Sequence, residues 1–169
     1  VVDWFEQQNI VLTTTDTNGN PLKIEWDQLA DAPGTSSYAA ARGGRFDEVH
    51  VVLIDDKGTI TGNAGTVLEK HLNLSKAKDA EYSVGSTAYW RKYLATNSRY
   101  IYGGSAPAGI VTSGFTAGTA TAIGNLDADS GWDQDASGVN FGLSGVVTAS
   151  LGGGTNYGDK TDYTTSGAL

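Results

Sequence analysis

The chain has 169 residues and a formal net charge of −8 at pH 7, with 19 Asp and Glu residues against 11 Lys and Arg residues. This acidic balance argues against direct contact with nucleic acid, because such binding depends on Lys and Arg side chains that neutralise phosphates. Cysteine is absent, which excludes disulfides, a thiolate nucleophile and a cysteine-based zinc ribbon. No apolar run approaches the about 20 residues that span a membrane, so we expect no membrane partner.

Two regions differ in composition. Residues 1–104 mix apolar, aromatic and charged side chains, whereas residues 105–169 are rich in Gly, Ser and Thr. We predict an α+β part of a larger domain in the first region, and in the second an extension with short edge strands at Ala108–Val111 and Leu143–Thr148. Methionine is absent even from position 1, and the last residues resemble a helix cap without its helix. We therefore expect a piece of a longer polypeptide, truncated at its C-terminal end.

The first predicted elements are a short helix and a hairpin. The helix runs from Asp3 to Gln8. Two strands, Ile10–Thr15 and Leu22–Trp26, flank the turn residues Asn18-Gly19, a dipeptide typical of tight hairpin turns. Apolar and charged residues alternate along the second strand, so we expect it to bury one face.

The block from Pro33 to Gly62 begins with a turn and a short helix. Thr35 or Ser36 can cap the first free amides of this helix, because Ser and Thr hydroxyls accept hydrogen bonds there. The helix covers Tyr38–Ala41 and is expected to stop at Gly43.

The same block continues as a strand. The β-branched apolar run Val49–Ile54 predicts a strand buried largely on both faces. Asp55–Gly58 then forms a turn, and Thr59–Thr61 is expected to return as the partner strand. The next apolar run, Val67–Leu74, fits neither a helical nor a strand period cleanly, and we assign it to a strand.

A second helix, capped by Ser86, is predicted to run to Ala95. Its apolar side chains form one stripe at helical spacing, which is typical of core packing rather than of a ligand platform. A strand at Arg99–Tyr102 follows. The stripe consists of Tyr89, Trp90, Tyr93 and Leu94.

Together these elements predict an α+β fold with a mixed or mainly antiparallel sheet and a few short helices on one side. A Gly-rich loop or arm region completes the chain. The irregular alternation of strands with few helices argues against a doubly wound parallel sheet.

A long, ordered set of short motifs lies between about Trp26 and Gly104. It resembles the contractile tail sheath protein of T4-like bacteriophages, including cyanophage-like relatives. Residues 105–169 share only the general Gly-rich character of that family. The motifs read PGTSSYAAARGG, FDEVHVVLIDDKGTITG, GTVLEKHLNLSKAKDA and AYWRKYLATNSRYIYGG.

The resemblance implies a structural role. A sheath protein of this family is a viral structural protein of the virion, which packs in hexameric rings around the tail tube and contracts during host infection and genome ejection. Its partners are other sheath subunits and the tail tube protein, and it is not an enzyme and uses no cofactor. The segment corresponds to the middle of the family's chain, so we expect the isolated fragment to be monomeric.

Two arginines are candidate interface residues. Arg42 and Arg45 flank Gly43-Gly44 in the block that carries the strongest resemblance. We predict that they form ion pairs at a subunit or domain interface. The alternative is ordinary surface charge, which contributes little.

Other patterns that suggest chemistry are incomplete. The acidic segment Asp127–Asp135 lacks the residues of a calcium loop at its fifth, sixth and twelfth positions, so we expect a solvated loop. In Gly153–Thr161, which is similar to a phosphate-binding loop, Asp159 precedes the lysine, and we expect an ordinary turn. His50 is expected to be a satisfied core or edge residue and His71 a surface or interface residue. We therefore predict no catalytic, cofactor-binding or metal-binding residues.

Two other functions remain open. The Gly-, Thr- and Asn-rich second half and the four tryptophans would also suit a carbohydrate- or surface-binding β-rich module. A hydrolase is the third hypothesis, motivated by the carboxylate pairs Asp47/Glu48 and Asp55/Asp56. These pairs lie beside predicted turns, where turn formation and solubility explain them.

Overall fold

The computed structural model describes Asp3 and residues 5–101, 116–117, 120–121, 133–141, 146, 148, 150 and 151. Three sequence predictions lie outside these residues: the edge strand Ala108–Val111, the turn Gly153–Thr161 and residues 127–132 of the acidic segment. Most of the predicted strand Leu143–Thr148 also lies outside them.

The described residues form an α+β fold, as the sequence predicts. Their strands pair as four separate antiparallel hairpins rather than as one sheet: β1 with β2, β3 with β4, β5 with β6, and β7 with β8. The elements are η1 (Phe5–Gln7), β1 (Asn9–Thr15), β2 (Pro21–Glu25), η2 (Trp26–Gln28), α1 (Ser37–Ala41), β3 (Glu48–Asp55), β4 (Thr66–Ser75), β5 (Glu81–Ser83), β6 (Ser86–Thr87), α2 (Trp90–Asn97), β7 (Thr116–Ala117) and β8 (Ala120–Thr121).

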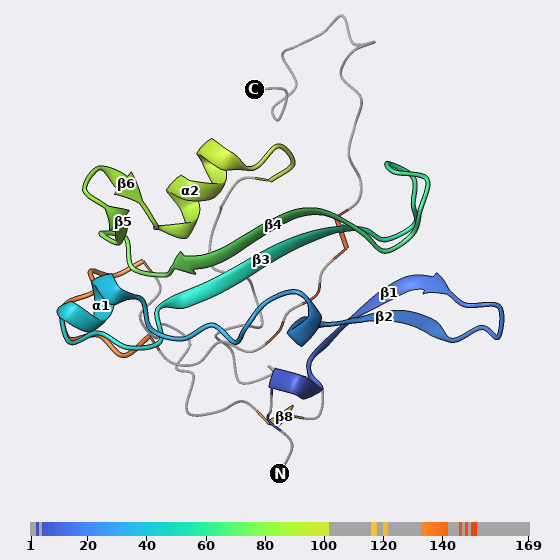
Figure 1. Cartoon of the computed structure of the whole chain (residues 1–169), viewed down its shortest axis with the longest axis horizontal. Coiled ribbons are helices and arrows are strands. Elements are labelled where there is room, and N and C mark those ends of the chain that lie inside the picture. Colours follow the sequence, from blue (N-terminus) through green and yellow to red (C-terminus); the bar gives the residue numbers. More distant parts are fainter. Residues whose placement is uncertain are drawn as a thin grey trace, which may run out of the picture.

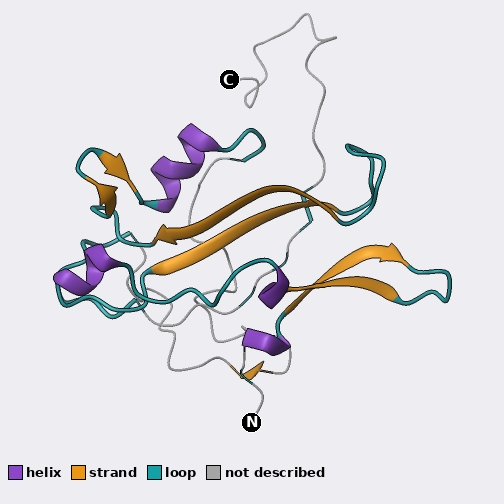
Figure 2. Cartoon of the chain, in the orientation of Figure 1, coloured by secondary structure: helices purple, strands orange, loops and turns teal. Residues whose placement is uncertain are grey.

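The β3–β4 hairpin is the longest element and lies at the centre of the described fold (Figure 1). Its residues Val49, Val51, Val52 and Ile54 are β-branched and favour an extended backbone. Most side chains of β3 are half-buried on both faces. Figure 2 shows α2 alongside β4, while α1 lies beyond the end where β3 begins.

The predicted partner strand Thr59–Thr61 is wrong. The Asp55 carboxylate Oδ2 accepts hydrogen bonds from the Ile60 amide at 3.0 Å and from the Thr61 amide at 2.7 Å. These bonds close a compact loop, because a short side-chain acceptor competes with ladder pairing for the same backbone amides. β3 pairs instead with β4, the run that we assigned to a strand.

The N-terminal hairpin β1–β2 is confirmed, and its ends are joined by the two 3-10 helices. η1 is shorter than the helix predicted from Asp3 to Gln8. Trp26, at the start of η2, donates its amide to the Gln8 carbonyl at 3.0 Å, which places η2 against the end of η1. The hairpin is also tied to the β3 loop, because the Thr13 amide donates to the Asp56 carboxylate at 2.7 Å.

Three small hydrophobic clusters form the core, rather than one continuous layer. The first lies between α1 and the residues after β4, the second under the β1–β2 hairpin, and the third between β4 and α2. Their buried members are Ala39, Ala77, Ala80, Ala88, Ala136 and Phe141 in the first; Phe5, Ile10, Leu12 and Trp26 in the second; and Leu74, Tyr89, Trp90 and Leu94 in the third.

The second helix begins later than predicted. Ser86 does not cap it, since Ser86 pairs with Ser83 in the β5–β6 hairpin. The helix α2 starts at Trp90, and the Tyr89 amide before it donates to the Thr87 hydroxyl at 3.2 Å. The expected core packing of the aromatic stripe is confirmed.

The strand predicted at Arg99–Tyr102 is also wrong for the part that the structure describes. The Ser98 hydroxyl accepts hydrogen bonds from the Tyr100 and Ile101 amides, at 3.2 and 3.1 Å. The Arg99 amide donates to the Glu69 carboxylate at 2.6 Å. Side-chain acceptors thus satisfy the backbone amides that a strand would have offered to a neighbour.

Residues 133–141, which we term the clip, pack against segments that lie more than 50 residues earlier in the sequence. The clip binds two segments, residues 76–79 and 42–45, and buries Ala136 and Phe141 in the first cluster. Its bonds run from Asp133 N to Lys76 O (2.9 Å), Lys78 N to Gln134 O (3.0 Å), Ala136 N to Asp79 Oδ1 (2.9 Å), Gly138 N to Arg42 O (2.9 Å), Arg45 N to Val139 O (3.0 Å) and Phe141 N to Arg45 O (2.9 Å).

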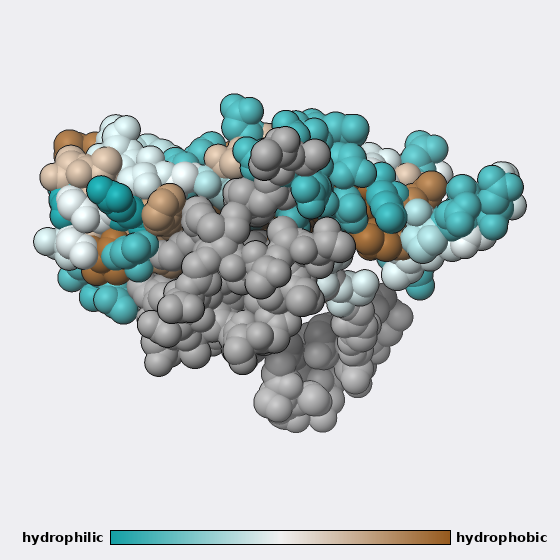
Figure 3. Space-filling view, turned by 90° about the horizontal axis from the view of Figure 1, so that it is seen from below, coloured by the Kyte–Doolittle hydropathy of each residue, from teal (hydrophilic) through white to brown (hydrophobic). Residues whose placement is uncertain are grey.

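The surface of the described residues is mainly hydrophilic on the face shown in Figure 3, and its apolar side chains form small, separate patches. Neither α1 nor α2 has the length and apolar character that a membrane-crossing helix needs, and the described residues contain no other helix that does.

We expect Phe141→Ala to lower the free energy of unfolding by about 3–5 kcal/mol, because it leaves a cavity where a fully buried ring had filled the space between alanines. Urea denaturation followed by circular dichroism measures the change. Val84→Ala is the control, since Val84 is fully exposed, and it should change the free energy by less than about 0.5 kcal/mol. Equal effects of the two variants would contradict the assignment of the clip to the core.

Candidate functional site

The Asp47 carboxylate is the buried centre of the region that carries the candidate interface residues. Asp47 is fully buried at the end of the loop before β3. Its Oδ1 accepts the Ser36 amide at 2.8 Å, and its Oδ2 accepts the Ser36 and Ser75 hydroxyls at 2.6 and 2.5 Å. The carboxylate therefore joins the start of α1, the start of β3 and the end of β4.

Ser36 is the N-cap of α1, as the sequence analysis allowed. Its hydroxyl oxygen accepts the Ala39 amide at 3.1 Å while the hydroxyl proton is donated to Asp47. A hydroxyl can do both at once, because it carries one proton and two lone pairs. The cap thus fixes the helix start and ties it to β3.

Phe46, next to Asp47, has a left-handed backbone conformation with φ of 59°. This conformation is unfavourable for a bulky side chain and persists only where its surroundings hold it. Here the Phe46 amide donates to the Thr35 hydroxyl at 2.9 Å, and the Phe46 carbonyl accepts from Lys76 Nζ at 3.0 Å. Both backbone polar groups of the strained residue are therefore held.

Lys76 is fully buried, which is unusual for a lysine side chain. Burial lowers its pKa from 10.5 to about 7, and the nearby Asp47 carboxylate partly opposes that shift. The Lys76 amide also donates to the Asp47 carbonyl at 2.8 Å. Removing an ammonium group from water costs free energy. The fold therefore loses some stability by burying Lys76, whose Nζ binds the Phe46 carbonyl.

The loop between α1 and β3 packs closely against the clip. Gly43 has φ of 74°, and a side chain on Gly44 would place its Cβ 2.5 Å from the Ala136 carbonyl oxygen. Arg45 donates its amide to Val139 and accepts the Phe141 amide through its carbonyl. The backbone of Arg45 is therefore fixed on both sides.

The structure places Arg42 and Arg45 on this one loop but in different surroundings. The Arg42 guanidinium stacks on the Tyr38 ring, with Cζ 3.5 Å from the ring centroid, and Nη1 donates to the Tyr38 carbonyl at 3.1 Å. The Arg45 side chain is exposed, and no carboxylate of the described residues lies within salt-bridge distance of it. Arg42 is therefore engaged within the chain, whereas the Arg45 guanidinium faces solvent.

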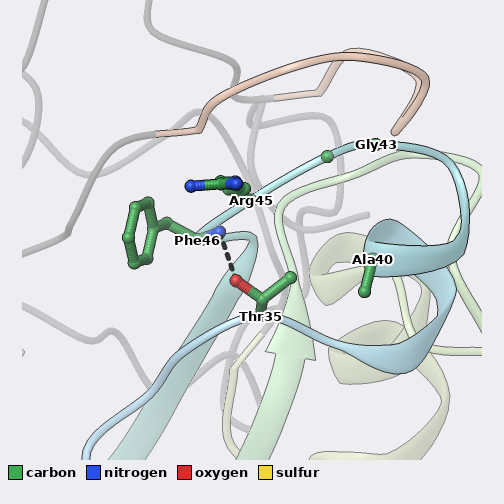
Figure 4. A pocket seen from close by; sticks show the side chains of 6 residues that line it. Thr35, Ala40, Gly43, Arg45 and Phe46 are labelled. Atoms are coloured by element: carbon green, nitrogen blue, oxygen red, sulfur yellow. Dashed lines mark hydrogen bonds between the residues drawn. The ribbon is translucent and has the colours of Figure 1, made fainter.

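Arg45 and Phe46 line a shallow pocket of about 430 Å³. Figure 4 shows their side chains close together on one side of the loop, with the bond from the Phe46 amide to Thr35 beneath them. The other lining residues are small or polar, so the pocket offers one cation and one aromatic ring. Its full lining is Thr35, Ala40, Gly43, Gly44, Arg45 and Phe46.

His71 is not on the surface, which corrects one of the two positions, surface or interface, that the sequence analysis gave it. It is buried, and its Nε2 lies 2.9 Å from the Glu69 carboxylate, because residues two apart on β4 share a face. Glu69 also accepts the Ser98 hydroxyl at 2.6 Å, and this bond is the main reason that its pKa falls from 4.5 to about 2. The pair joins β4 to the end of α2.

His50 is satisfied, as expected. Its Nδ1 accepts the Asn73 amide at 2.9 Å, so its Nε2 carries the proton and donates to the Asp31 carbonyl at 2.8 Å. Both ring nitrogens are thus used within the fold.

Within the described part of the acidic segment, Asp133 is structural rather than solvated, which corrects our expectation for that residue, whereas Asp135 is exposed as expected. The Asp133 Oδ1 accepts the Tyr89 hydroxyl at 2.6 Å and the Trp90 indole N–H at 2.9 Å, and its Oδ2 accepts Arg91 Nη2 at 2.6 Å. These three consecutive donors fasten the clip to the start of α2. No group of three or more potential metal-ligating side chains occurs among the described residues.

Carboxylates of both pairs that motivated the hydrolase hypothesis accept hydrogen bonds from backbone amides of the fold. Glu48 accepts the Gly34 amide at 2.9 Å, and Asp56 accepts the amide of Thr13. Of the four tryptophans behind the carbohydrate-binding hypothesis, Trp26 and Trp90 are buried in core clusters. The other two, Trp4 and Trp132, lie outside the described residues.

Comparisons with protein-family models, with curated proteins and with solved structures found no match to this chain.

Sequence reasoning missed the structural roles of three residues that organise the site: Asp47, Lys76 and Asp133. A pairing of Asp47 with Ser75 joins residues 28 apart, and a pairing of Asp133 with Arg91 joins residues 42 apart. Neither is visible as a local pattern. The engagement of Arg42 could have been found, because Tyr38 precedes it by four residues and such pairs face each other on a helix.

We expect Asp133→Asn to lower the free energy of unfolding by about 1.5–3 kcal/mol, because one acceptor oxygen becomes a donor that faces Tyr89, Trp90 or Arg91. Asn tolerates the left-handed backbone of this position, so the substitution tests the carboxylate alone. Urea denaturation is the measurement. Asp135→Asn, in an exposed pair with Lys78, should cost less than about 0.5 kcal/mol, and a cost equal to that of Asp133→Asn would contradict the anchoring role.

We expect the free energy of unfolding to rise with pH between about 7 and 10.5, because the folded protein has lost the Lys76 proton that the unfolded chain still binds. Lys76→Met should flatten this slope, whereas Lys78→Met, an exposed lysine, should leave it unchanged. Denaturant titrations are best kept below pH 10, because Tyr82 and Tyr89, whose pKa values are raised to about 12, lower stability above it. A slope that survives in Lys76→Met would show that another group causes it.

Proposed function

We propose that this chain is a structural piece of a phage contractile tail sheath subunit, which packs in hexameric rings around the tail tube. The proposal starts from the ordered motifs between Trp26 and Gly104 that resemble that family. In this role the protein acts in the virion, and its partners are other sheath subunits and the tail tube protein. It carries out no enzymatic reaction and needs no cofactor.

The observation that carries the proposal is that polar residues from three of the motifs bind one another inside the fold. Ser36 of PGTSSYAAARGG, Asp47 of FDEVHVV and Ser75 of LSKAKDA meet in one buried hydrogen-bond network. Lys76, the next residue of the third motif, holds the backbone of Phe46 in the second. Motifs whose polar residues are buried in mutual contact are typical of a scaffold, since a catalytic motif must present its polar groups to a substrate.

A sheath role also suits the mechanical character of the network. Contraction of such a lattice is a switch between two packings of rigid subunits, and the energy is stored when the lattice is assembled. Rigid subunits need local geometry that does not yield, and the network fixes the ends of α1, β3 and β4 relative to one another. No nucleotide enters this scheme.

Electron microscopy of the full-length parent protein, expressed together with the neighbouring tail tube protein, tests the proposal. We expect regular, striated tubes from the parent protein. The 169-residue chain by itself should stay monomeric at micromolar concentration and form no tubes, because it resembles only the middle of the family's sequence. Tubes formed by the isolated chain would contradict the expectation that this fragment cannot assemble, and a parent protein that never assembles would overturn the proposal.

A further inference from the structure

Arg45 and Phe46 present a cation and an aromatic ring side by side on the surface. Arg45 is exposed and Phe46 is half-buried at the rim of the shallow pocket (Figure 4). No carboxylate of the described residues pairs with the Arg45 guanidinium, although the chain as a whole is acidic. Its sister residue Arg42, on the same loop, is already stacked on Tyr38.

Hydrogen bonds hold the backbone of Arg45 and Phe46 on both sides. Phe46 keeps a left-handed conformation because Thr35 binds its amide and the buried Lys76 binds its carbonyl. Arg45 is bonded to the clip through both of its backbone polar groups. Strained residues that are held in this way cluster at functional sites. A backbone that is already ordered loses little further entropy when a partner binds.

The chemistry of the pair specifies the partner's surface. Arg and aromatic side chains dominate the energetically important positions of protein interfaces. A guanidinium binds a carboxylate in a bidentate, planar geometry, and the ring beside it excludes water from that bond. The pocket therefore fits a carboxylate that projects from another protein surface.

A second copy of this chain offers such carboxylates. With a net charge of −8, the chain carries more carboxylates than basic side chains. η1 and η2 contact each other, and each exposes one carboxylate, Glu6 and Asp27, for which the described residues contain no basic partner. These helices contribute to the second cluster, under the β1–β2 hairpin. The Arg45 loop borders the first cluster and lies near the end where β3 begins (Figure 1).

We propose that Arg45 and Phe46 form a docking point for Glu6 and Asp27 of a second copy of this chain. The two surfaces differ, so the contact is heterologous, and repeated head to tail it produces a ring if the rotation closes. The inference rests on the proposed function, in which the subunits form rings. It adds the surface and the partner residues by which one subunit binds the next.

Sedimentation equilibrium of the purified 169-residue chain, at concentrations up to about 1 mM and at low and high salt, tests the docking point. We expect weak self-association that high salt suppresses. Arg45→Glu should raise the dissociation constant by about tenfold or more, and the matched variant Arg42→Glu by less than about twofold. Mixing Arg45→Glu with the double variant Glu6→Lys/Asp27→Lys should restore association to within about threefold of the unsubstituted chain.

Phe46→Gly provides a second test. Gly accepts the left-handed backbone of this position without strain, so the substitution removes the ring and leaves the backbone bonds to Thr35 and Lys76 available. We expect it to raise the dissociation constant by about threefold or more. Circular dichroism checks that each variant retains its secondary structure.

The docking point is overturned if the chain is monomeric at every concentration, if Arg45→Glu and Arg42→Glu have equal effects, or if the mixed charge-reversal variants fail to associate. Its failure can be told apart from that of the proposed function. Tubes built by a full-length parent protein that carries Arg45→Glu would overturn the docking point and leave the sheath role intact. Association that depends on Arg45, in a parent protein that builds no tubes, would support the docking point and overturn the sheath role.

Discussion

The structure depends on one buried carboxylate, that of Asp47. A carboxylate inside a protein is tolerated only where hydrogen bonds replace its water, and here the Ser36 and Ser75 hydroxyls both donate to Oδ2. Because Asp47 directly precedes β3, these bonds fix the start of α1, the start of β3 and the end of β4 at one point. The strained Phe46 is the residue next to Asp47, and the Asp47 carbonyl accepts the amide of the buried Lys76, whose carbonyl in turn accepts the Asp133 amide of the clip.

The remaining stability is divided among three small hydrophobic clusters, and polar links join them. The cluster that receives the clip is built largely of alanines, which lets the clip's backbone approach closely but buries little apolar area for each residue. Hydrogen bonds that the Asp133 and Glu69 carboxylates accept from Trp90 and Ser98 make up for this, since they tie α2 to the clip and to β4. The described fold is thus held together as much by buried polar groups as by apolar packing.

Local patterns predicted the elements that local forces determine. The Asn18-Gly19 hairpin, the Ser36 cap and the packing of the aromatic stripe could all be predicted, because each depends on residues close together in sequence. The partner of β3 could not, since the Asp55 carboxylate binds the amides of the segment that we expected to pair with it. At the candidate site, the sequence singled out Arg42 and Arg45 but could not separate them. Both side chains are exposed, and they differ because the Tyr38 ring and carbonyl engage the Arg42 guanidinium, whereas the bonds of Arg45 to the clip involve its backbone.

The clip is synthesised after the segments that it binds, so these segments must wait for it during translation. A ribosome adds roughly 5–20 residues per second, so Asp133 is added several seconds after Lys76, which lies 57 residues earlier in the sequence. During that interval the carbonyl of Lys76, the alanine cluster and the backbone of Arg45 lack the partners that the clip later supplies. The nascent chain therefore completes this side of the fold only when its later residues arrive, and arrested translation before residue 133 would leave an apolar surface open to chaperones.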